Sequence, residues 1–138
     1  KGERRYINHG FKAIQIGCSA WTAEALKLTM PASVFSRSTE CHNQDKVSMG
    51  TIAARDCLRV LQLTEQVAAA TLLAAVQGIW LRIEMGELEK SSLTKDVSMM
   101  LDDIGSFFTL IDEDRPTDKL LRETIGYIQQ KRWDLYES

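Results

Sequence analysis

The stretch that decides the fold is VAAATLLAAVQGIWL, residues 67–81, which carries no charged side chain and only one amide, Gln77. It is longer than an ordinary strand and shows no alternation of apolar and polar residues, so it is read as a helix. A helix that is apolar on nearly every side is buried on every side. The stretch therefore predicts a central buried helix around which the rest of the chain packs.

The residues before this stretch extend the helix and give it one polar face. Asp45 could cap its first turn, and the polar stripe that follows lies opposite Ile52, Leu58 and Leu61. About 40 helical residues, 45–85, would span roughly 60 Å. A compact chain of this size has a radius of gyration of only about 14 Å. We therefore expect much of this helix to pack against protein outside these residues, which could be more chain, other subunits, or both.

Three further helices are predicted, over residues 10–30, 93–110 and 116–131, because apolar side chains recur there at helical spacing. Pro31 ends the first, and Pro116 suits the first turn of the last. Residues 32–43 are rich in serine and threonine and are expected to be irregular. The predicted fold class is all-α, a bundle of long helices forming one helical segment over residues 1–138.

Composition excludes several classes of partner. The chain has 138 residues, 44% hydrophobic and 26% charged, with a net charge of −2, so nothing favours nucleic acid. Its three cysteines lack metal-ligand spacing and suit a reducing cytoplasm, and no metal site is expected. The uncharged run is shorter than the roughly 20 residues that cross a bilayer, so no membrane role is predicted.

A cluster of polar residues, His42-Asn43-Gln44-Asp45, precedes the long helix. Free amides and the helix dipole favour a negative group there, while Glu40 and Asp45 could pair with an amine. Such a site could hold an amino acid by both ends. A well-capped helix start uses the same residue types, so both interpretations stay open. His42 is interpreted as a hydrogen-bonded group rather than a metal ligand, and Phe11 by default as a core residue.

The polar cluster, continued as Val47-Ser48-Met49-Gly50-Thr51-Ile52-Ala53-Ala54-Arg55, closely resembles the family of aromatic amino acid ammonia-lyases and 2,3-aminomutases. Three other segments are similar to that family in the same order. They are Asn8-His9-Gly10-Phe11-Lys12, Met30-Pro31-Ala32-Ser33-Val34 and Glu113-Asp114-Arg115-Pro116.

The resemblance implies that the chain is the C-terminal helical portion of a longer enzyme, a homotetramer whose subunits build each active site together. The family uses the cofactor 4-methylideneimidazol-5-one (MIO), formed from an internal Ala-Ser-Gly. That tripeptide is absent here, since Ala32-Ser33 is followed by Val34. The cofactor would come from an upstream segment, and these residues alone are expected to be inactive.

Four site residues follow from the resemblance. Asn43 matches an asparagine near the cofactor and the substrate amine, and Glu40 resembles an acid that could take a proton from that amine. Phe11 matches a phenylalanine near the substrate ring. Gln44 occupies a position where histidine-specific members carry Glu, and a neutral amide cannot ion-pair an imidazolium.

The resulting hypothesis is an MIO-dependent enzyme that eliminates or migrates the α-amino group of tyrosine or phenylalanine. A lyase releases the acrylate, whereas an aminomutase holds it and returns the nitrogen to the β-carbon. The rival hypothesis is a non-catalytic helical module that serves only oligomerisation.

Overall fold

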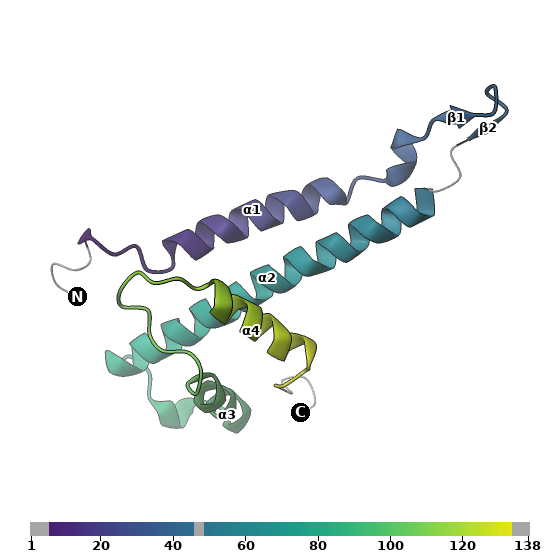
Figure 1. Ribbon diagram of the computed structural model, residues 1–138. Coiled ribbons are helices and arrows are strands. Elements are labelled where there is room, and N and C mark those ends of the chain that lie inside the picture. Colours follow the sequence, from purple (N-terminus) through teal and green to yellow (C-terminus); the bar gives the residue numbers. More distant parts are fainter. Residues whose placement is uncertain (1–5, 46–48, 134–138) are drawn as a thin grey trace.

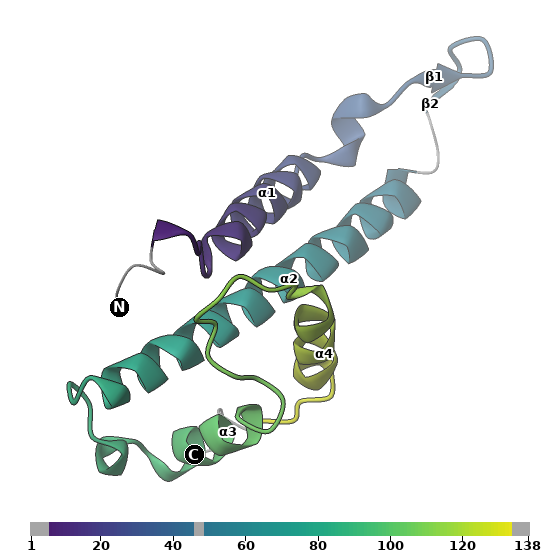
Figure 2. The same ribbon diagram turned by 60° about the vertical axis from the view of Figure 1, so that its left-hand side comes forward.

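The computed structural model describes residues 6–45 and 49–133 and shows an all-α protein, so the predicted fold class is confirmed (Figure 1). Two long helices run antiparallel, and two shorter ones pack on the second half of the longer helix (Figures 1 and 2). The helices are α1 (Lys12–Leu28), α2 (Met49–Glu84), α3 (Lys95–Ile104) and α4 (Asp118–Gln129). The short elements are η2 (Ala32–Phe35), β1 (Ser38–Thr39), β2 (Gln44–Asp45) and η3 (Lys90–Ser92).

Helix α2 is the long central helix on which the other helices pack. Its 36 residues span about 54 Å without a break at Gly78. The predicted start at Asp45 is wrong, because that residue pairs with Ser38 in the β1–β2 hairpin and α2 begins at Met49. Short polar residues stabilise a turn as readily as a helix cap, which is why the two structures could not be separated from the sequence.

Burial of α2 within this chain is one-sided. Leu63, Ala69, Leu73 and Val76 are fully buried or nearly so, while Leu81 is exposed. The expectation of a helix buried on every side is thus not met by the described residues alone. Helix α1 packs along α2, and α3 and α4 pack on its second half, while Ile52, Leu58, Leu61 and Leu81 of α2 stay exposed among the described residues.

The main hydrophobic cluster lies where α2 and α3 meet the segment after α3. It contains Leu73, Val76, Met100, Leu101, Ile104, Phe108 and Ile111. Trp80 stacks on Phe108 with ring centroids 5.3 Å apart. Gln77, the polar residue of the apolar stretch, accepts a hydrogen bond from the Ile111 backbone N–H at 2.8 Å and donates to the Ile111 carbonyl at 3.2 Å. The Gln77 amide therefore satisfies both the N–H and the carbonyl of Ile111, as the backbone of a neighbouring strand would.

Helices α3 and α4 are shorter than predicted. Thr94 caps α3 by accepting a hydrogen bond from the Val97 backbone, and the helix ends at Gly105. Residues 106–111 leave the helix, yet Phe108 and Ile111 still fill the core, so apolar spacing alone overextended the prediction to residue 110. Pro116 lies before Thr117, the N-cap of α4, rather than inside its first turn.

The segment after α4 is tied back to α3. Asp103 accepts two hydrogen bonds of 2.7 Å from the Arg132 guanidinium and one of 2.8 Å from the Trp133 indole N–H. The hydrogen bonds from Arg132 lower the pKa of the Asp103 carboxyl most, and the bond from Trp133 lowers it further. The Arg132 guanidinium also lies 4.2 Å from the centre of the Tyr127 ring. One carboxylate thus fixes the path of the chain beyond α4.

Among the described residues, α2 is the one helix that could cross a membrane by length and composition alone. An 18-residue window in it has a mean hydropathy of 1.4. The core helix of a globular protein passes the same test, so this composition does not distinguish the two. Glu65 within α2 accepts a hydrogen bond from Gln129 of α4, which is the contact of a helix packed against protein.

Candidate functional site

The polar cluster lies in a short hairpin between α1 and α2, with His42 and Asn43 in its turn and Gln44 and Asp45 in strand β2 (Figures 1 and 2). Ser38 pairs with Asp45 and Thr39 with Gln44, in antiparallel register. The tip turns through Glu40, Cys41 and His42, whose φ angles are +49°, +55° and +69°. Side chains of L-residues disfavour this left-handed region by about 1 kcal/mol or more per residue, so the hairpin holds its tip in a strained backbone.

Hydrogen bonds across the hairpin hold this tip in place. The Asn43 backbone N–H donates to the Glu40 carbonyl at 2.9 Å, and the Thr39 hydroxyl donates to the Gln44 carbonyl at 3.3 Å. The Ser38 hydroxyl and the His42 Nδ1 lie 2.6 Å apart. The interpretation of His42 as a hydrogen-bonded group is confirmed.

The hairpin leaves the side chains of the predicted site residues exposed. Glu40, Asn43 and Gln44 are all exposed, and no side chain or backbone group in the described part of the chain bonds the Asn43 carboxamide. A carboxylate and two carboxamides therefore project within five consecutive residues, with donors and acceptors available to a ligand. The structure brings these three predicted site residues together.

Phe11, the fourth predicted site residue, lies elsewhere. It is the N-cap of α1, is partly buried, and packs against the main hydrophobic cluster. Helix α1 has 17 residues, so about 25 Å of helix separates Phe11 from the residues that lead into the hairpin. Within one chain, Phe11 and the hairpin cannot contact the same small molecule.

A second polar arrangement joins the turn before α1 to the loop before α4, and the sequence analysis missed it. The Asp114 carboxylate accepts hydrogen bonds from the backbone N–H groups of His9, at 2.8 Å, and Gly10, at 2.9 Å. The Asp114 backbone N–H donates in return to the Asn8 side-chain oxygen at 3.0 Å. The partners are more than 100 residues apart in sequence, so no local sequence pattern predicts this pairing.

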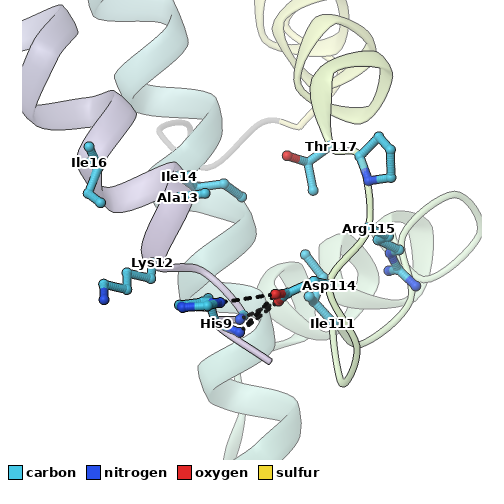
Figure 3. A pocket seen from close by; sticks show the side chains of 11 residues that line it. His9, Lys12, Ala13, Ile14, Ile16, Ile111, Asp114, Arg115 and Thr117 are labelled. Carbon is cyan, nitrogen blue, oxygen red and sulfur yellow. Dashed lines mark hydrogen bonds and ion pairs between the residues drawn. The ribbon is translucent and has the colours of Figure 1, made fainter. Parts of the chain in front are cut away.

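This arrangement, which we call the Asn8–Asp114 clasp, borders an open cleft of about 600 Å³ (Figure 3). Figure 3 shows Asp114 reaching from the loop before α4 toward the His9 backbone, with the Arg115 side chain directed away. The hydrogen bonds from the Gly10 and His9 backbone lower the pKa of the Asp114 carboxyl. Asp114 is therefore an anion at neutral pH, already saturated with donors, rather than an acid available for catalysis.

The cysteines and acidic residues suggest no other site. The three cysteines are free, with Cys41 and Cys57 exposed. Across residues 6–45 and 49–133, no three His, Cys, Asp or Glu side chains lie close enough together to hold a metal ion.

Comparison with known proteins assigns this chain to a family. The family model described as aromatic amino acid lyase matches residues 2–103, which include α1, the hairpin, α2 and all but the last residue of α3. The chain belongs to the aromatic amino acid lyase family. The Asp114 loop and α4 lie beyond the residues matched by the family model.

Several curated relatives of this chain are histidine ammonia-lyases. That of Desulfotalea psychrophila is 36% identical over 109 residues, which is 79% of this chain and 20% of the relative. That of Rattus norvegicus is 47% identical over 73 residues, covering 53% of this chain and 11% of the relative. The chain thus spans only 11% to 20% of the length of these relatives. No solved structure matches.

Proposed function

We propose that these residues form the C-terminal part of a cytoplasmic MIO-dependent enzyme that acts on the α-amino group of an aromatic amino acid. Membership of the aromatic amino acid lyase family supports the class of reaction. The observation that supports named residues is the hairpin, in which Glu40, Asn43 and Gln44 are exposed in or beside a tip that has positive φ angles at Glu40, Cys41 and His42. Strained backbone of this kind clusters at functional sites.

The chemistry of the hairpin fits an amino acid ligand. The Asn43 carboxamide can donate to a carboxylate and accept from an amine without carrying charge of its own. The Glu40 carboxylate can attract the amine and take a proton from it. Gln44 offers a second neutral amide beside the substrate side chain. Together these groups recognise a zwitterion and leave the aromatic ring to apolar partners.

The proposed site needs more than one copy of this chain. Phe11, the proposed partner of the substrate ring, lies about 25 Å or more along α1 from the hairpin of its own chain. A second chain can supply Phe11 to the hairpin of the first, which supports a homotetramer with sites between subunits. The exposed apolar side chains of α1 and α2, among them Leu26, Leu58 and Leu61, give such an assembly contact surface.

The residues present fit the proposed cofactor as neighbours and not as its source. The exposed Asn43 carboxamide, which bonds no other residue in the described ranges 6–45 and 49–133, is a suitable hydrogen-bond partner for a polar heterocycle. When bound, MIO supplies an electrophile that activates the substrate amine as a leaving group. The upstream part of the protein would have to supply the Ala-Ser-Gly that forms it, so residues 1–138 alone would be inactive.

Gln44 favours tyrosine or phenylalanine as the substrate, because a neutral amide gives no ion pair with an imidazolium. The second candidate is histidine, favoured by the relatives, which are histidine ammonia-lyases. Elimination to the acrylate is the reaction that the relatives' names favour, and migration to the β-amino acid is the alternative outcome.

The full-length protein tests the proposal directly. It is incubated separately with tyrosine, phenylalanine and histidine, and the ultraviolet absorbance of the arylacrylate, released ammonia and any β-amino acid are measured. We expect turnover of tyrosine or phenylalanine to exceed that of histidine. Preferred turnover of histidine would overturn the substrate assignment, and no turnover of any of the three would overturn the enzymatic proposal.

A further inference from the structure

The Asn8–Asp114 clasp acts on backbone rather than on side chains, unlike the surface ion pairs of this chain. One carboxylate accepts from two consecutive peptide N–H groups, those of His9 and Gly10, and lies 3.3 Å from the His9 Nδ1. By contrast, Arg59–Glu24 and Lys90–Asp102 join exposed side chains only. A carboxylate held by two adjacent backbone donors fixes the orientation of both peptide planes.

The backbone of the turn makes this grip possible. The backbone N–H groups of His9 and Gly10 donate to the same oxygen, Oδ1 of Asp114, and Gly10, with a φ of +55°, then turns the chain toward α1 in a left-handed conformation. The Lys12 N–H is satisfied within the turn by the His9 carbonyl at 3.1 Å. The Asn8 side chain closes the arrangement by accepting from the Asp114 backbone. The turn and the loop therefore hold each other.

Phe11 follows this turn directly. Its backbone is the N-cap of α1, and its ring is partly buried against the main hydrophobic cluster. The same cluster includes Ile111, three residues before Asp114, so the loop that carries the clasp also contributes to the core on which the Phe11 ring rests. Any displacement of the loop is thus transmitted to Phe11 through both the backbone and the core.

We propose that Asp114 is a positioning residue for the Phe11 ring, acting through the backbone of His9 and Gly10. This inference rests on the proposed function, in which Phe11 meets the aromatic ring of the substrate. It assigns a functional consequence to a loop that lies beyond the part of the chain matched by the family model. A ring shifted by a fraction of an ångström orients the substrate less well and slows turnover.

The test uses the full-length protein with Asp114→Asn, Phe11→Ala and the double variant. Asparagine keeps the shape of the side chain but removes its negative charge. It also replaces Oδ2, which accepts from the His9 backbone N–H at 3.0 Å, with an amide donor. Asp118→Asn is the matched control, because Asp118 is an exposed aspartate four residues away that pairs with Arg122 and backbone groups of its own helix and not with residues 8–12. Amide hydrogen exchange over residues 8–12 reports the clasp without any need for activity, and kcat and KM report its consequence.

We expect Asp114→Asn to speed amide exchange over residues 8–12 about tenfold and to lower kcat/KM about tenfold, with Asp118→Asn near wild type. In the Phe11→Ala background, Asp114→Asn should change kcat/KM less than twofold. An equal fold-change in both backgrounds would show a merely structural role and overturn the proposal, as would unchanged exchange. Should Asp114→Asn fail to assemble, Asn8→Ala removes the reciprocal bond and is judged by the same two readouts.

Failure of the proposed function would look different. A wild-type protein that turns over no aromatic amino acid removes the substrate role of Phe11, and the positioning proposal falls with it. The exchange measurement would then still report whether the clasp exists. An active wild type with additive effects contradicts the positioning of Phe11 alone.

Discussion

Phe11 and Gln44 lie at opposite ends of α1, Phe11 at its N-cap and Gln44 in the hairpin beyond its C-terminus (Figure 1). Both were predicted to face one substrate. A 17-residue helix between them keeps them about 25 Å or more apart within a chain, so only an assembly can bring them to one ligand.

Replacing Asn43 with alanine in the full-length protein should lower kcat about 100-fold, because a donor or acceptor aimed at a reacting group contributes on this scale. Folding should be unaffected, since Asn43 is exposed and its side chain bonds no described residue. Steady-state kinetics and thermal unfolding check both parts. Ser33→Ala, an exposed change in the nearby η2, serves as the control. Wild-type turnover by a well-folded Asn43→Ala protein would remove Asn43 from the site.

Replacing Gln44 with glutamate should move substrate preference toward histidine by about tenfold or more. A carboxylate can form a charge-assisted hydrogen bond with an imidazolium, which the neutral amide cannot. The measurement is the ratio of kcat/KM for histidine to that for phenylalanine. If the ratio stays the same in the variant, Gln44 does not face the substrate side chain.

Replacing Gln77 with alanine should destabilise the protein by about 2 kcal/mol, because both the N–H and the carbonyl of Ile111 lose their partly buried partner. Gln129→Ala, which breaks an exposed bond to Glu65, should cost less than about 0.5 kcal/mol. Urea unfolding of the full-length protein compares the two. Equal losses would mean that Gln77 does not anchor residues 106–111.

Replacing Asp103 with asparagine should make the free energy of unfolding depend less on pH in the acidic range. Arg132 and Trp133 lower the pKa of the Asp103 carboxyl below its usual 3.8. A lowered pKa stabilises the folded state above pH 3.8, and this contribution is lost as the pH falls through the lower folded value. Wild type should therefore exceed Asp103→Asn in stability at pH 7, and the difference should shrink below pH 3.8. A difference that is constant with pH would contradict the ionic origin of this contact.

Periodicity was enough to predict the helices and their order, because amphipathic spacing and the apolar run of residues 67–81 are local features of the sequence. It could not fix where helices end. Residues 106–111 keep the apolar spacing of α3 but lie outside the helix, and Asp45 has the composition of a cap but lies in a strand. Gly105 and the Ser106 hydroxyl, which donates to the Asp103 carbonyl, end α3 by contacts that spacing does not record.

Part of the candidate site could be predicted from local sequence, and part could not. Glu40, Asn43 and Gln44 are neighbours in sequence, so their proximity was predictable, and the structure adds the strained tip that exposes them. The Asn8–Asp114 clasp was not predictable, because its two halves are separated by almost the whole chain. The distance between Phe11 and the hairpin also required the three-dimensional structure, since it depends on α1 running straight between them.

In the proposed assembly, the hairpin of one chain and Phe11 of another complete one amino acid site. The most direct test mixes full-length Phe11→Ala and Asn43→Ala chains, each nearly inactive alone, and measures ammonia release by the co-assembled oligomers. Random assortment leaves one site in four with both wild-type residues, so about a quarter of the wild-type activity should return. Mixed oligomers that form, as shown by two affinity tags, but release no more ammonia than either parent would contradict the claim.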